Sequence, residues 1–308
     1  MKSDNDSKSD EVLSWCSFIL GQVEVVVDHS REHAGQRAAT RRLRTRSGYC
    51  YVKMHRDSSH WESEVHSYEH WAHAFGDFAP KLIAVRNEEP LALIISEIPG
   101  KILEEIQLSP SQQQSAWRTA GHALAVFHDL AVGDYFGPCR RDGTCAGTPI
   151  SDAREYILKD LACWLERGIR GGYLSRDQLS IVQAASALVP SFKGEHPVPC
   201  HRDYCPANWL VSGDGAWEGI IDFEFAYWDV RAADFTRYPA WDWISRPDLT
   251  KAFFDGYGRS FTYAEEQQLL VAHAQYALGA IVWGMENSYF GFAEDGRQAL
   301  KHLGKLLR

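Results

Sequence analysis

The sequence has little of several features that mark specialised classes of protein. Its seven Cys residues are odd in number and irregular in spacing, and no Cys-x-x-Cys pair occurs, which argues against a disulfide framework. No apolar run comes near the ~20 residues that a membrane-spanning helix needs. The first ten residues are polar and lack the apolar core of a signal peptide. We therefore expect a cytoplasmic protein that does not interact with a membrane.

Positive charge is also in short supply. The chain has 32 Lys and Arg against 41 Asp and Glu, a formal net charge of −9 and a pI of about 5.8. Because nucleic-acid-binding proteins normally carry a basic excess, we expect no nucleic-acid partner. An acidic balance favours cationic ligands instead. One basic cluster, from Arg37 to Arg46, is typical of a solvated strand face, and the alternative is a rim that attracts phosphates.

Several catalytic and metal-binding patterns are absent or weak. No Gly-x-Ser-x-Gly and no Gly-x-x-x-x-Gly-Lys-[Ser/Thr] segment occurs, so neither a serine hydrolase nor a Walker-type NTPase is supported. His66, His70 and His73 have a spacing on one predicted helix that could bind zinc. One buried histidine with two facing solvent explains that spacing better, so we predict no zinc site there.

Strand signals dominate the first hundred residues of this 308-residue chain, whose length suits two lobes of ~150 residues. β-Branched and alternating apolar residues predict strands over 23–27, 38–45, 49–55, 82–86 and 91–96, after a short helix over 11–20. Residues 46–48 indicate a hairpin, and residues 61–75 have the apolar spacing of an amphipathic helix. These segments predict a five-stranded, mostly antiparallel sheet with one inserted helix.

Helix signals dominate after Pro99-Gly100, which we interpret as a hinge. Helices are predicted over 111–130, 152–167, 176–189 and 263–288, and short strands over 209–211 and 219–222. The expected organisation is a disordered tail over residues 1–10, an N-terminal, nucleotide-binding lobe over 11–97 and a C-terminal, catalytic and substrate-binding lobe over 98–308.

The most informative segment is HRDYCPANWL at residues 201–210, followed by IDFE at residues 221–224. Asn208 follows Asp203 by five residues, and Asp222 follows it by nineteen. This order indicates a catalytic loop, a hairpin and a carboxylate at a strand end. Phosphoryl transfer uses such parts: one carboxylate orients the attacking hydroxyl and accepts its proton, while a second carboxylate and an amide oxygen hold Mg²⁺ on the phosphates.

These segments resemble a known family. HRDYCPANWL is similar to the His-x-Asp-x-x-x-x-Asn motif of aminoglycoside phosphotransferases, choline kinases and their relatives. IDFE resembles the family's Ile-Asp-x-Glu/Asp motif. Upstream, Tyr51-Val52-Lys53 resembles the strand that carries the nucleotide-binding lysine, and residues 93–100 resemble the hinge segment. Glu64 lies in the helix between them, and its spacing to Trp71 favours it over Glu62 as the partner of that lysine.

The resemblance implies a role for each matching residue. It makes Asp203 the catalytic carboxylate and makes Asn208 and Asp222 the ligands of Mg²⁺. It places Lys53 on the α- and β-phosphates of the nucleotide, where Glu64 holds it.

Further residues are assigned in the same way. Backbone groups of Ser96 and Ile98 would meet the adenine or guanine edge of the nucleotide. His201 would brace the catalytic loop, and Asp234 would steady it. One segment departs from the kinase pattern: residues 30–36 contain only Gly35, where protein kinases have a Gly-x-Gly-x-x-Gly loop over the phosphates.

The fold implied is α+β and protein-kinase-like, with a small antiparallel β N-terminal lobe and a larger, mainly helical C-terminal lobe. The activity implied is transfer of the γ-phosphate of ATP or GTP, with Mg²⁺, to a hydroxyl of a small molecule by a monomer or dimer. The favoured acceptor is an aminoglycoside or another amine-rich antibiotic, which would make the chain a resistance enzyme. The alternatives are a metabolite kinase of the choline, ethanolamine or homoserine type and a non-catalytic pseudokinase scaffold.

A cationic acceptor would need acidic groups in its cleft. Asp242 and Glu286 are the candidates for a carboxylate-lined wall in the C-terminal lobe. The triplet Trp241-Asp242-Trp243 either packs in the core or forms an aromatic and acidic wall for such a ligand.

Overall fold

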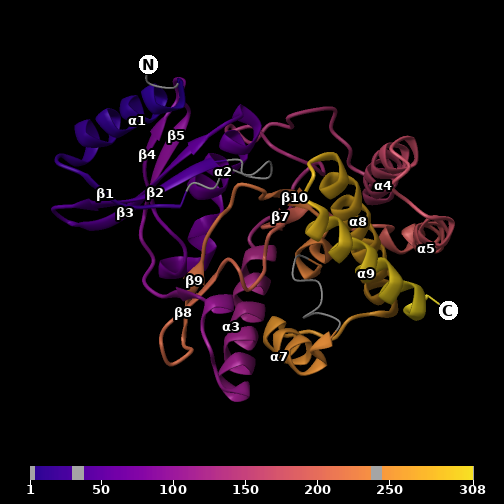
Figure 1. Ribbon diagram of the computed structural model, residues 1–308. Coiled ribbons are helices and arrows are strands. Elements are labelled where there is room, and N and C mark those ends of the chain that lie inside the picture. The colour runs from indigo at the N-terminus through magenta and orange to yellow at the C-terminus, as the bar shows by residue number, and fades with distance from the viewer. Residues whose placement is uncertain (1–3, 30–37, 237–244, 308) are drawn as a thin grey trace.

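The computed structural model describes residues 4–29, 38–236 and 245–307, which form a β-rich lobe and a helical lobe (Figure 1). The first sheet is antiparallel with the strand order β1-β2-β3-β5-β4. Its strands are β1 (Glu24–Asp28), β2 (Ala38–Thr45), β3 (Gly48–His55), β4 (Leu82–Arg86) and β5 (Ala92–Ser96). The predicted five-stranded sheet is therefore confirmed.

Both faces of this sheet are covered, because side chains alternate along each strand. Val52 of β3 and Ile94 of β5 face a core shared with helix α1 (Asp4–Leu20). Leu93 and Ile95 face the opposite way, into a larger core with helix α2 (Ser58–His70). Lys53 lies on this second face, which looks toward the C-terminal lobe.

Helix α1 corrects the expectation of a disordered tail over residues 1–10. The helix begins at Asp4 and continues to Leu20, so residues 4–10 are helical. Val12 and Cys16 pack on the sheet, and the Ser9 hydroxyl receives a hydrogen bond from Arg41 of β2. Docking on the sheet stabilises polar turns that would not form a helix alone in water.

The predicted helix over residues 61–75 is divided in the structure. Helix α2 starts after Asp57, whose side chain accepts a hydrogen bond from the His60 N–H, and it ends at His70. A 3₁₀ segment, η1 (Ala72–Phe78), follows and contains Gly76 at φ 59°. The spacing of apolar residues does not reveal the break, because Trp71 at the end of α2 and Phe75 in η1 are both buried.

A three-stranded sheet follows the hinge, in the order β6-β8-β9. Its strands are β6 (Lys101–Ile102), β8 (Trp209–Val211) and β9 (Trp217–Ile220). Gly100 precedes it at φ 121°, and a Cβ added there would lie 3.1 Å from the Val211 carbonyl oxygen, so the hinge needs glycine. The strand predicted over 219–222 ends instead at Ile220, which places Asp222 beyond the sheet.

The C-terminal lobe is mainly helical. Its helices are α3 (Pro110–His128), α4 (Ala153–Arg170), α5 (Arg176–Ser186), α7 (Pro247–Tyr257), α8 (Tyr263–Glu286) and α9 (Phe290–Leu306). Short 3₁₀ segments η2 (Leu103–Glu105), η3 (Val189–Phe192) and η4 (Arg231–Phe235) and a strand pair, β7 (Val198–Cys200) with β10 (Tyr227–Asp229), connect them. The four predicted helices are present with shifted ends, and α7 and α9 were not predicted.

Two cores hold this lobe together. One lies among α4, α5, α8 and α9, and the other joins α3 and α7 to the underside of the first sheet (Figure 1). No helix of the described segments is both long and apolar enough to cross a membrane.

Close contact between α3 and α7 depends on two glycines. A Cβ on Gly121 would lie 2.0 Å from the Phe253 carbonyl oxygen, and one on Gly256 would lie 1.8 Å from the Arg118 carbonyl oxygen. We expect Gly121→Ala to lower the free energy of unfolding by ~1–3 kcal/mol, because the helices must separate. Urea denaturation followed by circular dichroism measures the change.

Gly291 of α9 is the matched control. A Cβ there meets nothing within 4 Å. Gly291→Ala should raise the free energy of unfolding by ~0.4–1 kcal/mol through the unfolded chain. Equal effects of the two substitutions would contradict the packing argument.

Candidate active site

The centre of the candidate site is an ammonium group shared between the two lobes. Lys53 Nζ lies 2.6 Å from Glu64 Oε1 and 2.6 Å from Asp222 Oδ1. Glu64 comes from α2, and Asp222 from the segment after β9. The side chains of Lys53 and Glu64 are 7% and 0% exposed. Three residues predicted from the sequence are thus brought together inside the protein.

Carboxyl groups outnumber the ammonium in this cluster. Burial by itself would lower the pKa of Lys53, but Asp222 and Glu64 outweigh it and hold that pKa well above its ordinary value. Glu224 Oε2 lies 3.9 Å from Lys53 Nζ. Burial, and then the charge of Asp222, raises the pKa of Glu224 to about 8. Glu64 also meets His55, whose Nε2 lies 2.8 Å from Glu64 Oε2. Asp222 and Glu224 share the Lys53 ammonium, so the site favours an additional cation beside them.

A β-hairpin brings Asn208 and Asp222 side by side. Asn208 precedes β8 and Asp222 follows β9, and these strands pair with Trp209 opposite Ile220. The Ile221 N–H donates to the Asn208 carbonyl at 3.1 Å. Asn208 Nδ2 donates to the Asp203 carbonyl at 2.9 Å, so Oδ1 remains as the amide's acceptor. Carboxylate and amide oxygens are the ligands that Mg²⁺ prefers, and this pair could hold one.

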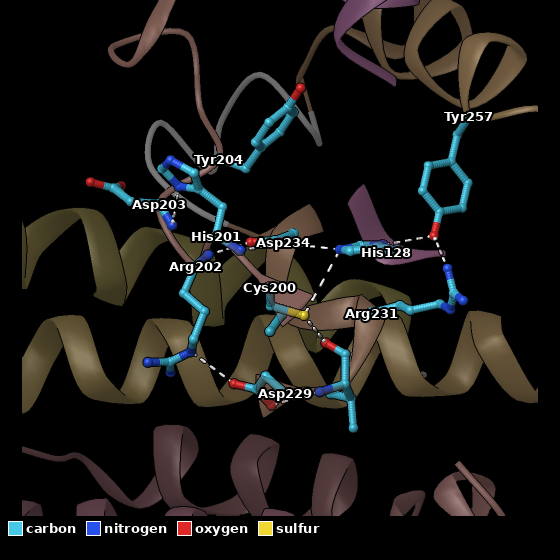
Figure 2. A network of polar contacts seen from close by, with 12 residues as sticks. His128, Cys200, His201, Arg202, Asp203, Tyr204, Asp229, Arg231, Asp234 and Tyr257 are labelled. Carbon is cyan, nitrogen blue, oxygen red and sulfur yellow. Dashed lines mark hydrogen bonds and ion pairs between the residues drawn. The ribbon is translucent and has the colours of Figure 1, made fainter. Parts of the chain in front are cut away.

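Asp234 fixes the loop that carries Asp203 (Figure 2). Its Oδ2 accepts the His201 N–H at 2.8 Å, and its Oδ1 accepts the Arg202 N–H. His128 of α3 donates from Nε2 to the same carboxylate at 3.0 Å. Asp234, His128 and His201 are fully buried. The arrangement matches the expectation that Asp234 steadies the catalytic loop.

His201 acts as a brace between two parts of the site. The Asp203 N–H donates to His201 Nδ1 at 3.3 Å, and His201 Nε2 lies 3.1 Å from the Ile221 carbonyl oxygen. Burial lowers the pKa of His201, so the ring is neutral and carries its proton on Nε2. The ring therefore ties Asp203 to the segment that carries Asp222, as expected.

The Arg202 and Asp203 side chains leave the loop in different directions (Figure 2). Arg202 has φ 61°, and Asp222 has φ 71°, a backbone region that residues other than glycine rarely adopt. Arg202 Nε lies 2.7 Å from Asp229 Oδ2, and the guanidinium carbon lies 3.9 Å from the centre of the Tyr227 ring. Arg202 is thus anchored on the C-terminal lobe.

The hinge narrows the assignment of Ser96 to one backbone group. The Ser96 N–H donates to the Lys81 carbonyl at 2.9 Å, and Ser96 Oγ accepts the Lys81 N–H at 2.8 Å. The Ser96 amide is therefore occupied, and only its carbonyl could meet a nucleotide base. Ile98 follows the end of β5, and its Cγ2 would lie 3.2 Å from a Cβ added to Gly219 of β9. The hinge thus packs on the hairpin that presents Asn208 and Asp222.

A cavity of about 420 Å³ opens beside the catalytic loop. Its aromatic lining consists of Tyr156, Trp164, Phe225, Tyr276, Trp283, Tyr289 and Phe292. Its ionisable lining consists of Asp160, Arg202 and Asp229. Because Arg202 immediately precedes Asp203, this cavity is the candidate position for the acceptor substrate.

Glu286, which was expected in the acceptor cleft, does not line this cavity. Glu286 forms an ion pair with Arg167, which lies over the Trp164 ring with 4.2 Å between its guanidinium carbon and the ring centre. The pairing removes Glu286 from the cavity wall. Asp242, the flanking tryptophans and the turn with Gly35 lie outside the described residues.

Asp160, Asp229 and His128 lie outside the motifs recognised in the sequence. A signal for Asp160 was present, because Tyr156, Asp160 and Trp164 recur every four residues and so share one face of α4. No local pattern marks Asp229 or His128, whose partners Arg202 and Asp234 are distant in the sequence.

Comparison with protein families agrees with this geometry. Residues 30–269 match the model described as the phosphotransferase enzyme family. The chain belongs to that family. A comparison with curated proteins found no match.

Solved structures of the same fold include aminoglycoside phosphotransferases. The ternary complex of a thermostable APH(4)-Ia mutant with ADP and hygromycin B superposes with a TM-score of 0.72 and 14% identity, over 96% of this chain and 98% of that one. Spectinomycin phosphotransferase APH(9)-Ia, with ADP and spectinomycin, gives 0.65 and 12% over 96% and 97%. The gentamicin complex of APH(2")-IIa gives 0.63 and 15% over 94% and 95%.

These matches confirm the two-lobed α+β fold. The family match identifies the chain as a phosphotransferase. At 12–15% identity the solved structures show the fold and leave the acceptor to be argued from the cavity itself.

Asp234→Asn tests the loop anchor. An asparagine would present an N–H₂ group to main-chain donors, so at least one hydrogen bond to a buried carboxylate is lost, each worth ~1.5–3 kcal/mol. We expect the free energy of unfolding to fall by about 3 kcal/mol and kcat to fall with it. Nucleotide affinity should change little, since Asp234 does not contact Lys53 or Asp222.

The control is Asp77→Asn, at a carboxylate that is 90% exposed, which should leave the free energy of unfolding within ~0.5 kcal/mol of the parent value. An Asp234→Asn protein with parental stability and kcat would show that the loop does not depend on this anchor.

Proposed function

We propose that the protein transfers the γ-phosphate of ATP or GTP to a hydroxyl group of a small molecule. The observation that carries the proposal is the Lys53 ammonium, held within 2.6 Å of both Glu64 and Asp222, beside the loop that bears Asp203. Phosphoryl transfer depends on positioning and on electrostatic stabilisation of phosphate oxygens, and this cluster supplies both. The ADP complexes of the structural neighbours support a nucleotide as the donor.

Each residue has a proposed role. Lys53 binds the α- and β-phosphates, and Glu64 orients it. Asp203 accepts the proton of the acceptor hydroxyl. Asn208 and Asp222 hold Mg²⁺, which would neutralise charge on the phosphate oxygens; their oxygen donors and the local excess of carboxyl groups fit such an ion. The Ile98 backbone and the Ser96 carbonyl meet the base.

Two observations favour different acceptors. The structural neighbours are named for, or bound to, hygromycin B, gentamicin and spectinomycin, which favours an amine-bearing antibiotic. The small cavity with aromatic walls favours instead a compact metabolite with one charged group, as in a choline- or ethanolamine-type kinase. Retention of Lys53, Asp203, Asn208 and Asp222 opposes a pseudokinase.

Nucleotide binding is the first test. Melting temperature should rise with millimolar Mg²⁺–ATP, Mg²⁺–GTP or both, because a ligand that binds only the folded state stabilises it. Differential scanning fluorimetry measures the shift. Asp222→Asn should reduce it, since it removes charge from the proposed metal site. The absence of any shift with either nucleotide would favour the pseudokinase.

Two substitutions separate chemistry from binding. Asp203→Asn removes a proton acceptor and keeps the shape, so nucleotide binding should survive while kcat falls by ~10²–10⁴-fold. Lys53→Ala removes a phosphate contact and strands Glu64, so nucleotide affinity and kcat should both fall and stability should drop by ~3–5 kcal/mol. Steady-state kinetics with an acceptor that the parent protein phosphorylates measures kcat and the KM for nucleotide. The measurements are made under conditions in which circular dichroism shows a folded protein.

Lys81→Ala is the control for loss of a lysine, because the Lys81 side chain is 72% exposed. It should leave both parameters unchanged. Near-parental kcat in Asp203→Asn would contradict the proposed mechanism.

A further inference from the structure

The wall of the cavity beside the catalytic loop carries two carboxylates, Asp160 and Asp229, and one cation, Arg202, which is ion-paired with Asp229. From this we propose that the acceptor carries a single positive charge on an apolar or aromatic body, with the charge at Asp160. The inference rests on the proposed function, because it assigns the substrate class of that site. It departs from the aminoglycoside or other amine-rich antibiotic that the family resemblance favoured.

Two of the three ionisable groups in the cavity wall neutralise each other. Arg202 Nε lies 2.7 Å from Asp229 Oδ2. Asp229 also accepts hydrogen bonds from the Tyr156 hydroxyl at 3.2 Å and from the Val230 N–H at 2.8 Å. The Arg202 guanidinium is stacked on Tyr227. This pair is satisfied within the protein and adds no net charge to the cavity.

The described hydrogen-bond partners of Asp160 are neutral, and the charge of Arg202 acts on it without forming an ion pair with it. Gln275 Nε2, from α8, donates to Asp160 Oδ2 at 3.0 Å, and the Trp164 side chain donates a second hydrogen bond. No ion pair within the described ranges includes Asp160. The protein encloses this carboxyl group except where it meets the cavity, and burial raises its pKa. An ionised group in such a place is costly unless a cation lies beside it, so the cavity favours a ligand that brings one.

Aromatic rings surround this carboxylate. Tyr156 and Trp164 lie one turn before and after Asp160 on α4, and Trp283 and Phe292 line the cavity from α8 and α9. Ring faces attract organic cations and also bury apolar carbon atoms. Trp164 already interacts with one cation, Arg167, over one of its faces. A lone carboxylate among rings thus suits a substituted ammonium group with an apolar body.

The same inventory opposes a polycation within this cavity. A second or third ammonium group would meet no free carboxylate there, because Asp229 is bound to Arg202 and Glu286 is bound to Arg167. Each unpaired ammonium would lose hydration without compensation.

The cavity lies next to the loop that bears the catalytic group. Arg202 lines the cavity and Asp203 is the next residue, with ~3.8 Å between their Cα atoms. The Asp203 side chain is not part of the cavity wall, so an acceptor anchored at Asp160 must extend past Arg202 for its hydroxyl group to meet Asp203.

Calorimetry without nucleotide tests the inference with two probes of one shape. The charged probe is benzyl(2-hydroxyethyl)dimethylammonium, and the neutral probe is its carbon isostere, in which a quaternary carbon replaces the nitrogen. We expect the charged probe to bind roughly tenfold or more tightly than its isostere. Asp160→Asn should abolish that preference, and Trp283→Leu should weaken the charged probe more than the neutral one. Spermine should bind no more tightly than the charged probe.

Glu166→Gln is the matched control, because Glu166 lies on the same helix with its side chain 75% exposed. It removes the same charge and should leave the preference intact. Equal affinity of the two probes for the parent protein, no binding of the charged probe at millimolar concentration, or an undiminished preference in Asp160→Asn would each overturn the inference. Because no nucleotide is present, this binding test does not depend on phosphoryl transfer. If the protein preferred the charged probe but transferred no phosphate, the proposed function would be refuted and the inference about the cavity would stand.

Discussion

The Lys53 ammonium, shared between Glu64 and Asp222, is the interaction on which the rest of the site depends. Its two contacts come from different lobes. The lengths of these two contacts, from Lys53 Nζ to Glu64 and to Asp222, therefore set the distance between α2 and the β8–β9 hairpin. Buried charges are costly to leave unpaired, and this cost makes the arrangement specific: moving either lobe would strand a carboxylate. Phe223 reinforces it from the next position, with its ring centre 5.2 Å from that of Tyr68 on α2.

Backbone strain appears at the two places where the site presents its charged groups. Arg202 and Asp222 both adopt positive φ without being glycine. Such conformations persist only when the surroundings over-determine them. Asp234 provides that constraint for the loop, and the Ile221 main chain, bonded to both His201 and Asn208, provides it for the segment before Asp222. The strain is thus held by groups that do not themselves take part in phosphoryl transfer.

The sequence predicted the parts of this site that repeat across a family, and it failed where tertiary packing decides. The spacing of Asp203, Asn208 and Asp222 was sufficient to predict that Asn208 and Asp222 lie close together. A short hairpin whose two strands pair leaves its ends little freedom to separate. The sheet was also predictable, since β-branched strands alternate with clear turns. Helix α1 was mistaken for a tail over residues 4–10 because its stability comes from Val12 and Cys16 docking on the sheet.

The contacts of Ser96 and Glu286 are ones that no local pattern reveals. Backbone groups of Ser96 were expected to meet the nucleotide base, and its carbonyl is left for that role because its N–H is bonded to the carbonyl of Lys81, just before β4. Glu286 was expected in an acceptor cleft, whereas it forms an ion pair with Arg167 of α4. In both cases the packing of distant elements decides which partner a group meets.

The cavity shows why the net charge of a chain is weak evidence for the charge of its ligand. Most of the acidic excess lies on surfaces exposed to solvent, where salt screens an interaction beyond ~8–10 Å. A ligand in the cavity meets instead Asp160, a neutralised Arg202–Asp229 pair and a set of rings. The selectivity of the cavity depends on the charge and the apolar surface that remain without a partner after these groups have bonded one another. For this chain that remainder is one carboxylate and apolar surface, so charge and shape must be recognised together at a single ammonium-sized position.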